Sequence, residues 1–153
     1  MIAVTLLSIN LYALRASLKK SVRNSDCAAK ALIDRQSGEL IGICTFTAYS
    51  LERQRVSWRP SGFTTFRNWC CQISHVGGAR KYQKRGFGQD LLCDFFEHVK
   101  KIHPALPIKG VYLDADPAAI NFYARLGFVQ LSATPNAFGA VPMFLAIQHI
   151  LAA

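Results

Sequence analysis

Acidic residues are scarce in this sequence. Its 153 residues include 9 Asp and Glu against 18 Lys and Arg, which gives a formal net charge of +9 at pH 7. A cleft that holds a small cationic substrate needs carboxylates, so this shortage disfavours polyamines and aminoglycosides as substrates. The surplus of cations favours polyanionic partners such as nucleic acid, acidic lipid or a phosphorylated cofactor, and is equally compatible with a solubilising surface.

The sequence also lacks a membrane-spanning run and a metal-binding pattern. No apolar stretch is long enough for a transmembrane helix, and the N-terminal stretch has neither the basic start nor the unbroken apolar run of a signal peptide. The cysteines are odd in number and show no C-x-x-C or Cys/His spacing; they are Cys27, Cys44, Cys70, Cys71 and Cys93. We therefore expect reduced, mostly buried thiols, no metal site, no membrane attachment and a cytoplasmic location.

The pattern that is present alternates strands with helices. Apolar spacing predicts helices at 7–22, from the glycines near residue 86 to about residue 102, and at 117–126. Strands are predicted at 29–34, 40–49, 68–77, 109–115, 128–131 and 141–150. This order predicts a single α/β domain over residues 1–153, built on one mixed sheet.

The predicted helix at 117–126 has recognisable ends. Asp116 is a good N-cap residue, and Pro117 suits the first helical position. Gly127 directly follows the helix and suits a left-handed C-cap.

The stretch KYQKRGFGQDLL, residues 81–92, places two glycines directly before an apolar helix. The unpaired amides and the dipole of a first helical turn attract an anion, and glycines let it approach the backbone closely. Four nearby cations add charge: Arg80, Lys81, Lys84 and Arg85. Neither the P-loop motif nor the complete dinucleotide motif is present. The stretch therefore predicts a site for an anionic group such as a pyrophosphate.

Two motifs resemble one known family. Residues 83–88, Gln-Lys-Arg-Gly-Phe-Gly, resemble the Q/R-x-x-G-x-G/A motif of the GNAT superfamily of N-acetyltransferases, where it holds the pyrophosphate of acetyl-CoA. Downstream, LDADPAAINFYARLGF at 113–128 is similar to the family's N-x-x-A-x-x-F-Y-x-x-x-G-F, with Asp116 in place of the usual Asn. The resemblance implies the GNAT fold, acetyl-CoA as the cofactor and transfer of an acetyl group to an amine.

The resemblance also implies the site residues. Tyr123 matches the tyrosine that protonates the CoA sulfur in many relatives, and a phenol carries its proton at neutral pH, as a general acid must. A backbone amide near residues 76–78 is expected to polarise the acetyl carbonyl, where Gly77 and Gly78 open the strand. The general base stays open between His75, Glu52 and a water chain. The residues expected to contact the cofactor are Val76, Gly78, Gln83, Lys84, Arg85, Gly86, Phe87, Gly88, Gln89 and Asp116.

One GNAT subgroup is more similar than the rest. Toxin-type GNAT proteins of bacterial toxin–antitoxin modules acetylate aminoacyl-tRNA, and the stretches INLYALRASLKK (9–20) and GELIGICTFTAYSLERQRV (38–56) resemble theirs. HVGGA at 75–79 departs from the subgroup's usual R-L-A-V-D, and the first strand and the acidic helix common upstream are expected to be truncated or absent. The resemblance implies aminoacyl-tRNA and a small antitoxin as partners, and a homodimer as a common assembly of the family.

The segment 50–69 combines arginines with tryptophans and phenylalanines. Such a mixture suits single-stranded RNA, because bases stack on aromatic rings and phosphates form ion pairs with arginines. Candidates for substrate contact are therefore Arg53, Arg55 and Trp58. The alternative is that the aromatic residues belong to the core and the arginines are solvated. Three functions stay open: acetylation of aminoacyl-tRNA, acetylation of a small-molecule amine or protein N-terminus, and non-catalytic binding of CoA or RNA.

Overall fold

The computed structural model describes residues 2–6, 16–51 and 68–153, and describes only the backbone at 2–6, 16–19 and 80. The chain divides into two compact units. The first unit comprises Met1–Thr47 and Ser74–His98, and the second comprises Ala48–Ile73 and Val99–Ala153.

The strands form a mixed sheet with the order β1-β2-β3-β4-β5-β7-β6. Their bounds are β1 Ile2–Leu6, β2 Ala28–Asp34, β3 Leu40–Leu51, β4 Asn68–Gly78, β5 Gly110–Ala115, β6 Val129–Gln130 and β7 Val141–Ala146. β4 and β5 pair in parallel, whereas β1 with β2, β2 with β3, β5 with β7 and β6 with β7 pair antiparallel. The predicted α/β class with a mixed sheet is confirmed.

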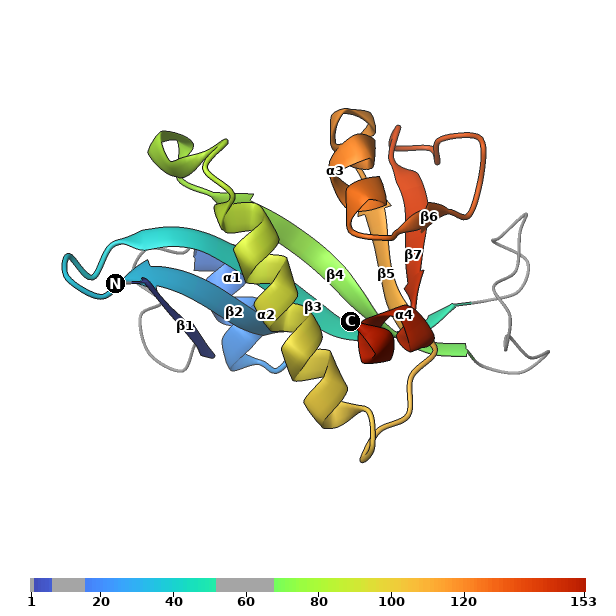
Figure 1. Ribbon diagram of the computed structural model, residues 1–153, viewed down its shortest axis with the longest axis horizontal. Coiled ribbons are helices and arrows are strands. Elements are labelled where there is room, and N and C mark those ends of the chain that lie inside the picture. The colour runs from blue at the N-terminus through green and yellow to red at the C-terminus, as the bar shows by residue number, and fades with distance from the viewer. Residues whose placement is uncertain (1, 7–15, 52–67) are drawn as a thin grey trace. The chain divides into compact units, whose positions relative to one another are not determined.

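Helices and short 3₁₀ turns lie between these strands, and one helix follows the last strand (Figure 1). The helices are α1 Ala16–Arg23, α2 Phe87–Ile102, α3 Ile120–Arg125 and α4 Ile147–Ala152, and the 3₁₀ turns are η3 Arg80–Tyr82 and η4 Pro117–Ala119. Among the helices within the described ranges, none is long and apolar enough to cross a membrane.

In the first unit, α1 and α2 lie on opposite faces of β2 and β3 (Figure 1). Val22 of α1 packs against Ala29 and Ile43 on one face. On the other face, Phe46 packs against Phe95 of α2, with 4.9 Å between the ring centroids. Because successive strand residues point to opposite faces, each strand supplies a core to both helices.

A buried charge also joins α2 to β2. Lys30 is buried, and its ammonium group pairs with the carboxylate of Asp94 and donates to the Asp94 carbonyl at 3.1 Å. A buried ammonium needs such partners, because desolvation without them is costly. The pair therefore constrains where α2 lies on this face of the first unit.

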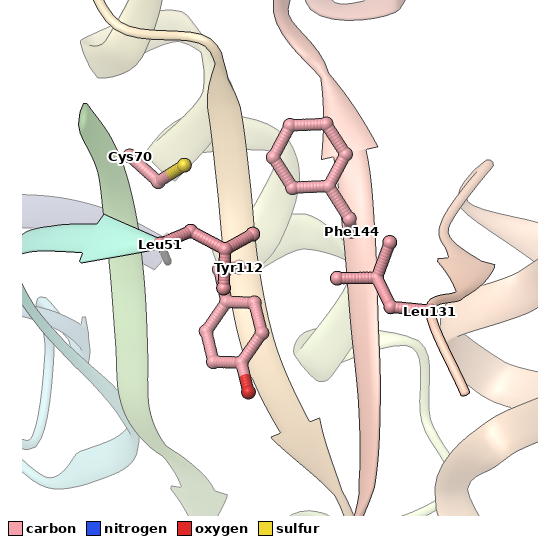
Figure 2. Close-up of a cluster of buried hydrophobic side chains, with 5 residues drawn as sticks. All are labelled: Leu51, Cys70, Tyr112, Leu131 and Phe144. Carbon is pink, nitrogen blue, oxygen red and sulfur yellow. The ribbon is translucent and has the colours of Figure 1, made fainter. Parts of the chain in front are cut away.

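The second unit has its own apolar cluster, shown in Figure 2. Its buried members come from β3, β4, β5, β7 and the segment after β6; they are Leu51, Cys70, Tyr112, Leu131 and Phe144. The Tyr49 ring stacks on Tyr112 at 5.2 Å, and the Tyr112 hydroxyl donates to Asp114 at 2.9 Å. Burial of this apolar surface stabilises β5 and β7, the two strands from which α3 and α4 follow.

The sequence prediction was wrong at the C-terminal end. The stretch 141–150 was expected to be one strand, but β7 ends at Ala146 and Ile147–Ala152 is a helix. Ile147 and Ile150 are both buried, and residues three apart share a face in a helix but not in a strand. A hydrogen bond from the Ile147 amide to the Lys109 carbonyl, 2.9 Å long, fixes the helix start.

The N-terminal region agrees with part of what was predicted. β1 is a short strand of five residues and pairs with β2 from Ile2↔Asp34 to Leu6↔Lys30. The helix predicted at 7–22 is confirmed from Ala16, since α1 spans Ala16–Arg23. Residues 7–15 lie outside the described residues.

Candidate active site

The glycine loop joins β4 to α2 in the first unit. After β4 ends at Gly78, the chain makes the turn η3 and then passes through Lys84 and Gly86, both with positive φ, at +61° and +84°. α2 begins at Phe87, and the Asp90 amide donates to the Gly86 carbonyl at 3.1 Å. The predicted start of the helix at the glycines is confirmed. By helix geometry, the amides of Phe87, Gly88 and Gln89 have no acceptor within α2.

The side chains of the loop differ in what they contact. Gln83, Lys84, Arg85 and Gln89 are exposed, and Phe87 is half-buried. The Arg85 guanidinium lies 5.9 Å from the ring centroids of both Tyr82 and Phe87. Arg85 is thus held at the loop by two aromatic faces while its charge stays near the helix start.

Lys81 was expected to add its charge to the anion site, but it has an acidic partner within the chain. Its ammonium group pairs with the carboxylate of Glu39, whose second oxygen accepts a hydrogen bond from the Tyr82 hydroxyl at 2.7 Å. The hydrogen bonds from Lys81 and then Tyr82 lower the pKa of Glu39. The loop cations with no acidic partner among the described residues are Lys84 and Arg85.

The end of β4 is extended up to Gly78. Val76 is half-buried, and His75, Gly77 and Gly78 are exposed. A Cβ at Gly78 would lie 2.7 Å from the Ile41 carbonyl oxygen, and the Ala79 amide donates to the same oxygen at 3.1 Å. Gly78 therefore allows close packing of β4 on β3. The parallel pairing of β4 with β5 runs from Cys71↔Val111 to Ile73↔Leu113.

Tyr123 lies on α3 in the second unit and is half-buried. Its ring meets those of Phe122 and Phe128 edge-on, at centroid distances of 5.1 and 5.6 Å. Its carbonyl accepts the amides of Leu126 and Phe128 at 3.0 and 3.1 Å, which closes the end of the helix. The ring is thus held by aromatic contacts on two sides.

Asp116 caps the helical segment that carries Tyr123. Its carboxylate accepts the Ala118 amide at 2.8 Å, with Pro117 at the first position of η4. Gly127 has a φ of +99°. The predicted N-cap and left-handed C-cap are therefore confirmed.

Four other candidate site residues lie outside the described residues: Glu52, Arg53, Arg55 and Trp58. Within the described ranges, no group of three or more His, Cys, Asp or Glu residues could hold a metal ion.

Comparison with known proteins decides the family. The sequence matches the acetyltransferase (GNAT) family over residues 8–128. The chain belongs to the GNAT acetyltransferase family. It is an N-acetyltransferase that uses acetyl-CoA. No curated protein sequence matches this GNAT chain.

Solved structures share the fold. A bacterial toxin of known crystal structure is 68% identical to this GNAT chain, covers 99% of it and 94% of its own chain, and has a TM-score of 0.90. The toxin AtaT complexed with acetyl-methionyl-tRNAfMet is 17% identical, with 99% and 98% coverage and a TM-score of 0.82. A tyrosine-to-phenylalanine mutant of AtaT, bound to the C-terminus of the antitoxin AtaR and to acetyl-CoA, is 18% identical, with 98% and 96% coverage and a TM-score of 0.77.

The glycine loop of this GNAT acetyltransferase fits the diphosphate of its cofactor. The loop offers first-turn amides, a helix dipole and the charges of Lys84 and Arg85, and a Cβ at Gly86 would meet nothing within 4 Å. When bound, acetyl-CoA supplies an activated acetyl thioester.

Sequence reasoning missed Glu39 and Tyr82. Neither belongs to the GNAT motifs, and the two residues are 43 positions apart along the chain. No local sequence signal relates them, because the contact forms only when the turn before β3 lies beside η3 in the folded chain.

Proposed function

We propose that this acetyltransferase is a toxin of a bacterial toxin–antitoxin pair and that it acetylates the amino group of an aminoacyl-tRNA. The observation that carries the proposal is the 68% identity to a bacterial toxin over 99% of the chain. The fold of AtaT, which was solved with acetyl-methionyl-tRNAfMet, supports the class of acceptor. The net charge of +9 favours a polyanionic acceptor in the same way.

The proposed site has two parts. The cofactor's diphosphate lies against Gln83, Lys84, Arg85 and the amides of residues 86–89, and the backbone near Val76 and Gly78 faces its acyl end. Tyr123 is the general acid, and Asp116 orders the helix that carries it. Arg53, Arg55 and Trp58 are proposed contacts of the tRNA.

The proposal also covers the setting of the protein. Residues 1–153 form one GNAT domain, because β3, β4 and α2 each contribute residues to both units.

The partner that inhibits the toxin is a small antitoxin with an acidic segment, whose charge would complement the basic chain. Charged tRNA and acetyl-CoA are found together in the cytoplasm, which is therefore the proposed location. A homodimer stays a prediction.

The test is acetylation of charged tRNA with labelled acetyl-CoA. The wild-type protein should label the aminoacyl group, and Tyr123→Phe should lower kcat by about 10²- to 10⁴-fold at neutral pH, because the phenol proton is lost. Tyr49→Phe is a matched control, since Tyr49 stacks on Tyr112 and belongs to neither part of the proposed site.

Two results would contradict the proposal. Labelling of small amines or protein N-termini with no labelling of charged tRNA would reject the acceptor. Equal kcat values for Tyr123→Phe and the wild-type protein would reject the general acid, with the acceptor unaffected.

A further inference from the structure

Glu39 joins the hairpin between β2 and β3 to the turn that precedes the glycine loop. One carboxylate oxygen pairs with the Lys81 ammonium group, and the other accepts the Tyr82 hydroxyl at 2.7 Å. Glu39 itself is fixed in the hairpin, because its carbonyl accepts the Asp34 amide at 2.9 Å. A hydrogen bond from the Ala79 amide to the Ile41 carbonyl, 3.1 Å long, joins the same two segments.

The contacts continue from Tyr82 to the start of α2. The Tyr82 ring meets the ring of Phe87 edge-on at 5.9 Å, and the Arg85 guanidinium lies 5.9 Å from each of the two ring centroids. Phe87 is the first residue of α2. A continuous series of contacts therefore runs from the carboxylate of Glu39 to the first turn of α2.

The loop between these contacts has an uncommon backbone. Lys84 has a φ of +61° although it is not a glycine, and Gly86 has a φ of +84°. A non-glycine residue in the left-handed region is unfavourable and persists where surrounding contacts determine the conformation. Glu39 supplies such contacts on the N-terminal side of the loop.

Glu39, Lys81 and Tyr82 keep the protonation states that this contact requires at neutral pH. Hydrogen bonds from Lys81 and Tyr82 lower the pKa of Glu39, and the hydrogen bond with Glu39 raises the pKa of Lys81 and of Tyr82. The carboxylate is therefore charged while Lys81 and Tyr82 keep their protons. A hydrogen bond from a neutral hydroxyl to a carboxylate is stronger than one between neutral groups.

We propose that Glu39 is a positioning residue for acetyl-CoA, because its contacts with Lys81 and Tyr82 hold the glycine loop in the conformation that receives the diphosphate. The inference rests on the proposed role of that loop. Glu39 does not touch the cofactor in this account. Its effect is to reduce the conformational freedom that binding would otherwise have to remove.

Steady-state kinetics and calorimetry with CoA test the inference. Glu39→Gln and Tyr82→Phe should each raise the KM for acetyl-CoA and the Kd for CoA by about three- to tenfold, with kcat changed by less than about twofold. The double variant should raise this KM and this Kd by about as much as the more strongly affected single variant, because both substitutions remove parts of one contact.

Asp34→Asn is the matched control. Asp34 lies in the same hairpin, and the substitution changes the net charge by the same amount, but its carboxylate accepts the Gln36 amide at 2.9 Å within the turn. It should leave the KM for acetyl-CoA unchanged. Thermal unfolding of every variant shows whether it is folded, and the separation of KM from kcat distinguishes positioning from a general loss of structure.

The outcomes separate this inference from the proposed site. If the wild-type protein binds no CoA, the proposed site fails and the inference fails with it. If the wild-type protein binds CoA and Glu39→Gln has the same affinity as Asp34→Asn, only the inference is overturned. A higher affinity in Glu39→Gln would also overturn it, because it would show that Glu39 withholds the Lys81 cation from the diphosphate.

Discussion

The two adjacent glycines at the end of β4 have different neighbours. A Cβ at Gly78 would lie 2.7 Å from the Ile41 carbonyl oxygen, whereas a Cβ at Gly77 would meet nothing within 4 Å. Gly78→Ala should therefore lower the free energy of unfolding by about 1–3 kcal/mol, since backbone must move to admit the methyl group. Gly77→Ala is the control and should be close to neutral. Urea denaturation measures both, and equal effects would contradict the close approach.

The cysteines differ in burial and hence in reactivity. Cys93 is exposed and Cys27 is half-buried, whereas Cys44, Cys70 and Cys71 are buried. Burial raises the pKa of Cys70 and of Cys71 to about 12. Iodoacetamide at about pH 8 should therefore modify Cys93 first and leave the buried thiols intact in the folded protein, because the thiolate is the reactive form. Mass spectrometry of the digested protein shows the order of modification.

The same burial predicts how stability depends on pH. In the unfolded chain a thiol ionises near its ordinary pKa of about 8.5, whereas Cys70 and Cys71 keep their protons in the folded state. The unfolded state then binds fewer protons, so these two residues make stability fall as the pH rises from about 8.5 to 12. Denaturation midpoints of the wild-type protein and of Cys70→Ala/Cys71→Ala should converge over this range.

At the scale of elements, the start of α2 depends on the conformation of Gly86. Its φ is +84° and a Cβ would meet nothing within 4 Å, so Gly86→Ala introduces backbone strain alone. The substitution should cost about 1 kcal/mol of stability. It should also weaken CoA binding, because the loop amides would lose their arrangement.

Gly139→Ala is the control for this prediction. Gly139 has a φ of +77°, has equally open surroundings and lies between β6 and β7. It should cost a similar free energy of unfolding and leave the Kd for CoA unchanged. Calorimetry with CoA and urea denaturation separate the two effects, and equal Kd values for both variants would refute the role of Gly86.

At the scale of the whole molecule, charge dominates the proposed encounter with tRNA. The chain carries a formal net charge of +9. Binding through about four phosphate contacts should lose about 10²-fold in affinity between 50 and 200 mM salt, because each contact releases counterions. Filter binding with charged tRNA over a salt series measures the slope. A salt-independent affinity would show that the charge merely solubilises the protein.

Several features of the second unit could be predicted from short stretches. Asp116, Pro117 and Gly127 mark the ends of the helical segment, and the structure has a cap at Asp116 and a positive φ at Gly127. Such signals act within a few residues, so they survive without knowledge of the rest of the fold. The prediction of a single strand at 141–150 was wrong, because a short apolar run suits a strand and a buried helix equally well.

The sequence by itself determined the family, the glycine loop with its helix start, and the capped segment that carries Tyr123. The loop and the capped segment depend on backbone requirements that glycine, proline and capping side chains impose locally, and the family motifs consist of these same stretches. Only the tertiary structure decided that Lys81 pairs with Glu39, that Gly78 packs on the Ile41 carbonyl and that α4 follows β7. The reason is physical: these features depend on which distant segments come into contact, and one-dimensional spacing does not encode that.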